Sequence, residues 1–159
     1  MVLAQESARP MTASKVAKMS DKARILIVDD DEVVRWSYRR SLESISCNVA
    51  AASDGEQALQ TMEENPFDVV LLDMRMPGQD GLSVLRTIKQ KWPESEVVII
   101  TGYPTVDSAK EAVRLGAYDY VAKPVGPQDV VNVTDGAMTR KHWALHRVPE
   151  ESAAGSCTV

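Results

Sequence analysis

Short apolar runs alternate with amphipathic segments along this chain, and that alternation limits the possible folds most strongly. Residues 24–28, 67–72 and 96–101 are rich in Val, Ile and Leu and show no polar alternation. Strands buried on both faces, as in a parallel sheet, have this composition. Weaker runs at residues 48–52 and 118–122 bring the predicted strands to five.

Helices are predicted between these strands because apolar residues recur there every three or four positions. Pro66 and Pro93 end two of the helices, since the residue before a proline disfavours helical geometry, and Gly116 ends a third. We expect the inward-facing residues to be Val34, Tyr38, Leu42, Ile45, Ala58, Leu59, Met62, Leu85, Ile88, Trp92, Val106, Ala109 and Val113.

The last helix, beginning at Pro127, is the weakest of the predicted elements. Val130, Val133 and Ala137 share one of its faces, but residues 130–136 are poor helix formers. We therefore expect this helix to be frayed or bent near Gly136.

Strands that alternate with helices predict an α/β fold: a five-stranded parallel sheet with helices on both faces. Functional sites of such sheets lie at the carboxyl ends of the strands. The residues expected at that edge are Asp29, Asp30, Asp31, Asp73, Thr101 and Lys123.

The residue types at this edge suit phosphoryl transfer. Carboxylates held close together repel one another, and the pKa of at least one should rise unless a cation intervenes. Mg²⁺ fits, because it binds one or two carboxylates and keeps water and phosphate oxygens as its other ligands. Lys123 adds a mobile positive charge and Thr101 a hydroxyl donor. A carboxylate can then accept a phosphoryl group covalently.

Four motifs, in this order, resemble the receiver domains of two-component response regulators. They are Ile-Leu-Ile-Val-Asp-Asp-Asp at residues 25–31, Leu-Leu-Asp-Met-Arg-Met-Pro-Gly at residues 71–78, Thr101-Gly102 and Lys123-Pro124. The resemblance implies the flavodoxin-like strand order 2-1-3-4-5. Residues 101–106 and 116–120 are most similar to receivers attached to σ54-type activators.

The resemblance also implies how the site is divided among its residues. Asp73 would accept the phosphoryl group and bind Mg²⁺, Asp30 would bind Mg²⁺ directly, and Asp29 would do so directly or through water. The backbone carbonyl of Arg75 would complete the metal shell.

Three further residues would respond to the phosphoryl group. Thr101 and Lys123 would bind it, and the Lys123-Pro124 peptide would be cis. Tyr120 matches the family's switch aromatic, which turns inward when Thr101 moves, although simple packing is an alternative. Arg75 and Tyr103 are bulky neighbours of the acceptor, and we predict that they slow dephosphorylation.

The resemblance implies a signalling switch rather than an enzyme, one that assists only its own phosphoryl transfer and slow dephosphorylation. The phosphodonor would be a sensor histidine kinase or a histidine phosphotransfer protein. Output would pass through protein–protein contact or phosphorelay, and a homodimer stays open.

Other classes of function fit less well. A phosphatase that uses an aspartyl phosphate needs an Asp two residues after the nucleophile, where this chain has Arg75. A DNA-binding regulator needs a helix-turn-helix, for which the residues after Pro124 are too few, and the net charge of −5 also disfavours nucleic acid. The complete set of site residues disfavours a receiver that works without phosphorylation.

The ends of the chain differ in composition from its middle. We expect a disordered leader at residues 1–22, the receiver domain at 23–147 and a flexible tail at 148–159. Only two cysteines are present, and the apolar runs are too short for a signal peptide or a bilayer span, so we expect a cytoplasmic protein.

Overall fold

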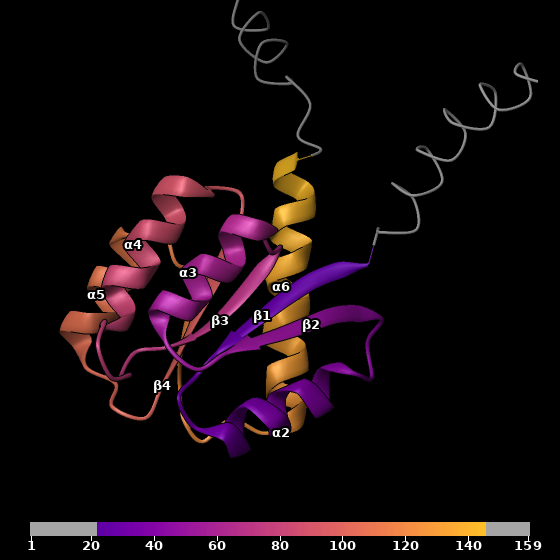
Figure 1. The fold of residues 1–159 in the computed structure, drawn as a ribbon, viewed down its shortest axis with the longest axis horizontal. Helices are drawn as coiled ribbons and strands as arrows, with labels where there is room; N and C mark the ends of the chain where they lie inside the picture. Colours follow the sequence, from indigo (N-terminus) through magenta and orange to yellow (C-terminus); the bar gives the residue numbers. More distant parts are fainter. Residues whose placement is uncertain (1–21, 146–159) are drawn as a thin grey trace, which may run out of the picture.

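The apolar runs of the sequence form the strands of one parallel sheet. The computed structural model describes residues 22–145, so most of the predicted leader and all of the predicted tail lie outside the described residues. The strand order is β2-β1-β3-β4-β5 and every neighbouring pair is parallel, which confirms the predicted fold class (Figure 1). The strands are β1 (Ala23–Val28), β2 (Cys47–Ala52), β3 (Val69–Asp73), β4 (Glu96–Thr101) and β5 (Asp119–Ala122).

Helices cover both faces of this sheet. Residues of α3, α4 and α5 pack into one apolar core, and residues of α2 and α6 pack into a second core on the other face. Asp and Thr side chains cap the amino termini of the first four helices by accepting backbone N–H groups. The helices are α2 (Glu32–Leu42), α3 (Gly55–Glu64), α4 (Gly81–Lys91), α5 (Val106–Arg114) and α6 (Pro127–Leu145).

The prediction that the last helix is frayed or bent near Gly136 is wrong. Helix α6 runs without interruption for 19 residues. Gly136 allows close packing, because a Cβ atom at this position would lie 2.5 Å from the hydroxyl oxygen of Tyr118. Burial of Val130, Thr134 and Ala137 against the sheet outweighs the poor intrinsic helix propensity. Nowhere in residues 22–145 is a helix both long and apolar enough to cross a membrane.

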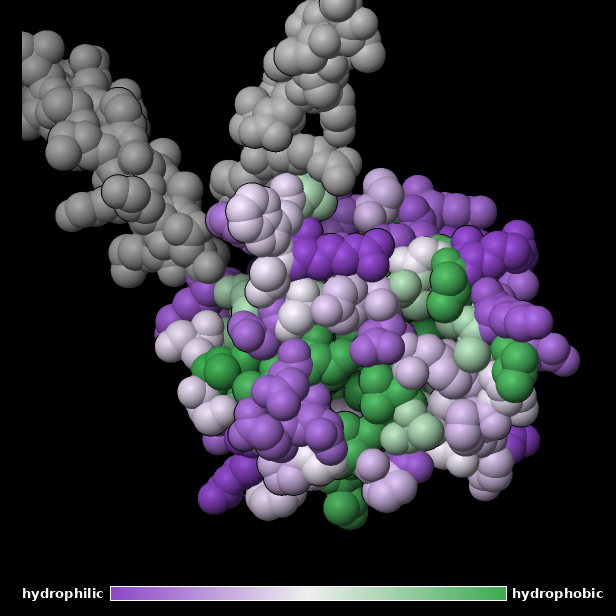
Figure 2. Space-filling view, turned by 180° about the vertical axis from the view of Figure 1, so that it is seen from behind, coloured by the Kyte–Doolittle hydropathy of each residue, from purple (hydrophilic) through white to green (hydrophobic). Residues whose placement is uncertain are grey.

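The predicted inward face of α5 is wrong at two of its three positions, and only Ala109 is half-buried. Val106 and Val113 are 70% and 68% exposed, whereas Ala112 is fully buried. The small alanine allows the helix to lie close to the sheet, so α5 is rotated away from its valines. Apolar side chains remain on other surfaces too: in the view from behind, they gather near the middle of the face with hydrophilic residues around them (Figure 2).

Candidate functional site

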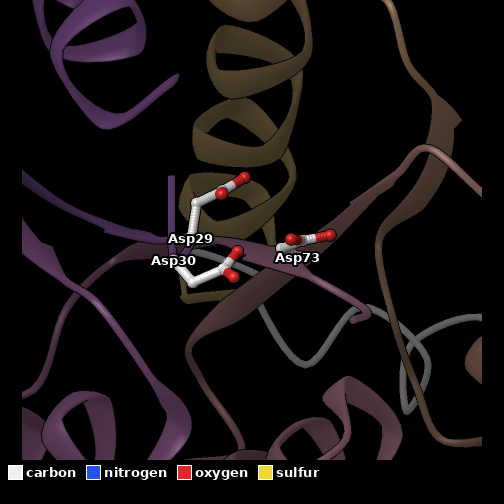
Figure 3. A group of neighbouring side chains, drawn as sticks. All are labelled: Asp29, Asp30 and Asp73. Carbon is white, nitrogen blue, oxygen red and sulfur yellow. The ribbon is translucent and has the colours of Figure 1, made fainter. Parts of the chain in front are cut away.

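Three acidic residues meet at the carboxyl ends of β1 and β3 (Figure 3). One carboxylate oxygen from each of Asp29, Asp30 and Asp73 lies within 4.8 Å of the others. Asp29 and Asp73 are buried, while Asp30 is exposed. The fold therefore brings together the three carboxylates that the sequence marked as candidate metal ligands.

Lys123 enters the same pocket from the end of β5. Its Nζ donates a hydrogen bond to Asp29 Oδ2 at 2.9 Å and lies 3.7 Å from Asp73 Oδ2. Burial works against the charged ammonium, but the hydrogen bond to Asp29 and the two carboxylate charges outweigh it and raise the pKa of Lys123. The Lys123-Pro124 peptide is cis, as predicted. A protonated lysine thus bridges two buried carboxylates.

The charge of Lys123 does not balance the pocket. Burial, followed by the charge of Asp29, raises the pKa of Asp73 above its ordinary value. Lys123 and the backbone N–H of Arg75, which donates to Asp73 Oδ1 at 3.4 Å, lower this pKa without cancelling the rise. A raised pKa of one carboxyl is what the sequence predicts for this cluster when a divalent cation is absent.

The turn between β1 and α2 is held by hydrogen bonds of its own. Asp29 Oδ1 accepts the N–H of Asp31 at 2.9 Å, and Asp31 caps α2 by accepting the N–H of Val33. Arg35 Nη1 donates to the backbone carbonyl oxygen of Asp29 at 2.7 Å. Sequence reasoning missed Arg35, because an arginine at the end of the first turn of a helix carries no local signal for a contact back to the preceding loop.

Thr101 ends β4 beside the acidic cluster. Asp73 pairs in the sheet with Ile100, the residue before Thr101. The Thr101 side chain is fully buried, and its Oγ1 accepts the N–H of Tyr103 at 3.0 Å. Tyr103 is exposed, and its ring centre lies 4.1 Å from the guanidinium carbon of Arg75. Arg75 and Tyr103, the two bulky residues that the sequence placed beside Asp73, therefore stack on each other in a cation–π contact.

Tyr120 ties β5 to the beginning of α5. Its hydroxyl accepts the N–H of Thr105 at 3.3 Å and is hydrogen-bonded to Ser108 Oγ. Thr105 Oγ1 also accepts the N–H of Ser108 at 3.0 Å. Sequence reasoning singled out Tyr120 but missed Thr105 and Ser108, the two residues that bond to its hydroxyl. In the sequence these two look like ordinary residues at the start of a helix.

The sheet topology and the acidic pocket define a class of protein. Residues 25–135 match the family model of the response regulator receiver domain, so the chain belongs to this family. Receiver domains take phosphoryl groups from histidine kinases and typically use Mg²⁺.

The chain is also similar in sequence to curated response regulators. The chain is 35% identical over 133 residues to the DNA-binding transcriptional regulator NtrC of Klebsiella pneumoniae, covering 84% of this chain and 28% of the relative. It is 38% identical over 134 residues to the transcriptional regulatory protein ZraR of Escherichia coli K12, covering 84% of this chain and 30% of the relative. The chain thus spans less than a third of these relatives.

Solved structures agree with this assignment. A receiver domain protein from Clostridium thermocellum superimposes with a TM-score of 0.72 at 35% identity, covering 77% of this chain and 98% of the other. A CheY-like receiver from Methanospirillum hungatei JF-1 gives a TM-score of 0.74 at 27% identity, with the same two coverages. The similarity extends over nearly the whole of both solved chains.

Proposed function

We propose that this chain is a phosphorylation-dependent switch that accepts a phosphoryl group on Asp73. The observation that carries the proposal is the convergence of Asp29, Asp30, Asp73 and Lys123 at one edge of the sheet. Carboxylates from two strands, with a lysine from a third, match the requirements of phosphoryl transfer to a carboxylate.

The acidic cluster suits Mg²⁺. Three carboxylates within 4.8 Å of one another form a hard oxygen donor set, and one lysine is the only cation paired with them among the described residues. Asp29, Asp30 and Asp73, with the backbone carbonyl of Arg75, would hold the ion. When bound, Mg²⁺ would offset the negative charge of the phosphoryl oxygens.

In the transfer step, an Asp73 carboxylate oxygen forms a bond to phosphorus. The bond from phosphorus to the donor's histidine nitrogen breaks, and that nitrogen keeps the electron pair. Lys123, already 3.7 Å from Asp73 Oδ2, pairs with the transferred phosphoryl oxygens. The hydroxyl of Thr101 donates to the same group. Asp73 must be ionised to attack, and a bound divalent cation would favour its ionised form.

The switch itself would run from Thr101 to Tyr120. Thr101 Oγ1 holds the N–H of Tyr103, and the Tyr120 hydroxyl holds the N–H of Thr105, so the loop before α5 is fastened at two points. Drawing Thr101 toward the phosphoryl group loosens the first point. Tyr120 then leaves its hydroxyl partners and turns inward, and α5 shifts.

We infer that the phosphodonor is a sensor histidine kinase or a histidine phosphotransfer protein and that the switch works in the cytoplasm. Output passes through protein contact or phosphorelay, and a homodimer is one form that such contact could take. Direct nucleic-acid binding is not proposed, because the chain carries a net charge of −5. A phosphatase is disfavoured by Arg75, which cannot act as a general acid two residues after the nucleophile.

Intact mass spectrometry after incubation with acetyl phosphate and Mg²⁺ tests the proposal. Wild type and the control Asp135→Ala, which removes an exposed aspartate on α6, should each gain one phosphoryl group. Asp73→Ala should gain none, and removal of Mg²⁺ should abolish the adduct on all three proteins. An adduct on Asp73→Ala, or none on wild type with acetyl phosphate and phosphoramidate alike, would refute Asp73 as the acceptor.

A further inference from the structure

The β1–α2 turn carries two of the candidate metal ligands, Asp29 and Asp30, and they differ in how their carboxylates are held. Asp29 is held through both carboxylate oxygens, by the N–H of Asp31 and by Lys123. In the part of the chain that the structure describes, no hydrogen bond or ion pair holds the exposed carboxylate of Asp30. The position of Asp30 therefore depends on the backbone that carries it.

Arg35 holds that backbone. Its Nη1 donates to the Asp29 carbonyl oxygen at 2.7 Å, and this oxygen belongs to the peptide that joins Asp29 to Asp30. Fixing the carbonyl fixes the plane of the peptide and, with it, the direction in which the Asp30 side chain leaves the chain. A guanidinium donor makes this a charge-assisted bond, stronger than an ordinary amide contact.

The guanidinium is itself held by a rigid element. Arg35 is the fourth residue of α2, its N–H donates to the Asp31 carbonyl oxygen at 3.0 Å, and the Asp31 side chain caps the same helix. Sites supported by helices are held more accurately than sites supported by loops alone. We propose that Arg35 is a positioning residue for Mg²⁺: it orients the Asp29–Asp30 peptide so that Asp30 faces the acidic pocket. This inference rests on the proposed Mg²⁺-dependent function.

The sign of the change in Mg²⁺ affinity on replacing Arg35 distinguishes a positioning role from a purely electrostatic one. A cation beside a metal site repels Mg²⁺, so removing the Arg35 charge should tighten Mg²⁺ binding if charge were its only contribution. Positioning has the opposite sign, because losing the hydrogen bond leaves Asp30 free to adopt other directions. Outer contacts that orient metal ligands typically change affinity by about 10- to 100-fold when they are removed. Since Arg35 acts through one backbone carbonyl, we expect the lower end, about tenfold weaker.

Titration of the ¹⁵N-labelled protein with MgCl₂, followed through amide chemical shifts, tests the inference without phosphorylation. Arg35→Met, which keeps the apolar stem but removes the donors, should bind Mg²⁺ about tenfold more weakly than wild type. Arg35→Lys, which keeps a donor and the charge, should recover part of the loss. Arg39→Ala, which removes an exposed arginine from the next turn of α2, should bind Mg²⁺ like wild type.

The same spectra show whether each variant is folded, and Arg35→Lys provides a second test if Arg35→Met unfolds. Unchanged or tighter Mg²⁺ binding by a folded Arg35→Met would overturn the positioning role. Weaker Mg²⁺ binding by Arg39→Ala, to the same extent as by Arg35→Met, would also overturn it, because the effect would then not depend on the hydrogen bond of Arg35. Failure of wild type to bind Mg²⁺ at all would instead overturn the proposed function on which the inference rests.

Discussion

Replacing Asp73 by Asn should stabilise the metal-free protein, although Asp73 is the residue on which the proposed function depends. The structure allows the size of this effect to be worked out. At an effective dielectric constant of about 20, two carboxylate oxygens at the limiting separation of 4.8 Å repel each other by about 3.5 kcal/mol, and an ion pair at 3.7 Å gains about 4.5 kcal/mol. Asp73 faces two carboxylates and one lysine, so repulsion prevails by about 2 to 3 kcal/mol.

Part of this excess is screened, because Asp30 is exposed to solvent. We therefore expect Asp73→Asn to increase the free energy of unfolding by about 1 to 2 kcal/mol at neutral pH without Mg²⁺. Urea denaturation in the presence of a chelator measures this difference. Asp135→Asn, a change at an exposed position on α6, should leave the unfolding free energy unchanged.

The pH dependence gives a second check on the same reasoning. The pKa of Asp73 is raised in the folded state, so between the ordinary Asp value and this raised value the folded protein binds more protons than the unfolded chain. Wild type should therefore gain stability relative to Asp73→Asn as the pH falls through this window, and the advantage of the mutant should shrink. Mg²⁺ should shrink it as well, by neutralising the repulsion. A destabilised Asp73→Asn protein at neutral pH without metal would refute the reasoning.

Three further predictions concern the neighbours of the site and the packing of α6. Arg75→Ala and Tyr103→Ala should each shorten the lifetime of the phosphorylated protein, measured as phosphate release. In the double variant the lifetime should shorten by less than the two single effects combined, because the stacked pair acts together. An unchanged lifetime would contradict this. Thr134→Val should raise the free energy of unfolding in urea by about 0.5 to 1 kcal/mol, since the buried Thr134 hydroxyl has no hydrogen-bond partner among residues 22–145, and a loss of stability would argue against this. Gly136→Ala should lower it by about 1 kcal/mol through contact with Tyr118, and adding Tyr118→Phe should restore part of the loss; a stabilised single variant would exclude the contact.

The sequence predicted best the elements whose side chains are buried on every side. The central strands are apolar on both faces, so their positions and the acidic residues at their ends follow from the sequence pattern alone. The rotation of α5 does not, because Val106 and Val113 are more apolar than Ala112 yet lie outside. Close approach to the sheet favours the small residue, and only the tertiary structure shows which face approaches.

The contacts missed at the site have a similar cause. Ser108 and Arg35 each make a hydrogen bond outside their own helix, and the spacing of apolar residues does not predict such bonds. Ser108 bonds to Tyr120 on β5, and Arg35 bonds to the loop before its own helix. Gly136 shows the reverse case, in which a residue that weakens a helix locally is required by a neighbouring side chain. Local propensity predicts such positions poorly because packing outweighs it.

The acidic pocket is arranged so that stability and signalling oppose each other. Lys123 is closer to Asp29, at 2.9 Å, than to Asp73, at 3.7 Å, so Asp73, the proposed acceptor, is the less well neutralised of the two buried carboxylates. Burial, followed by the charge of Asp29, raises the pKa of Asp73, and Lys123 does not cancel the rise. A divalent cation therefore gains more by binding here than it would in a pocket whose charges were already paired. The unpaired negative charge that destabilises the metal-free fold is therefore the same charge that favours Mg²⁺ binding. Because Lys123 lies 3.7 Å from Asp73 and does not hydrogen-bond to it, its ammonium remains available to pair with the proposed phosphoryl group.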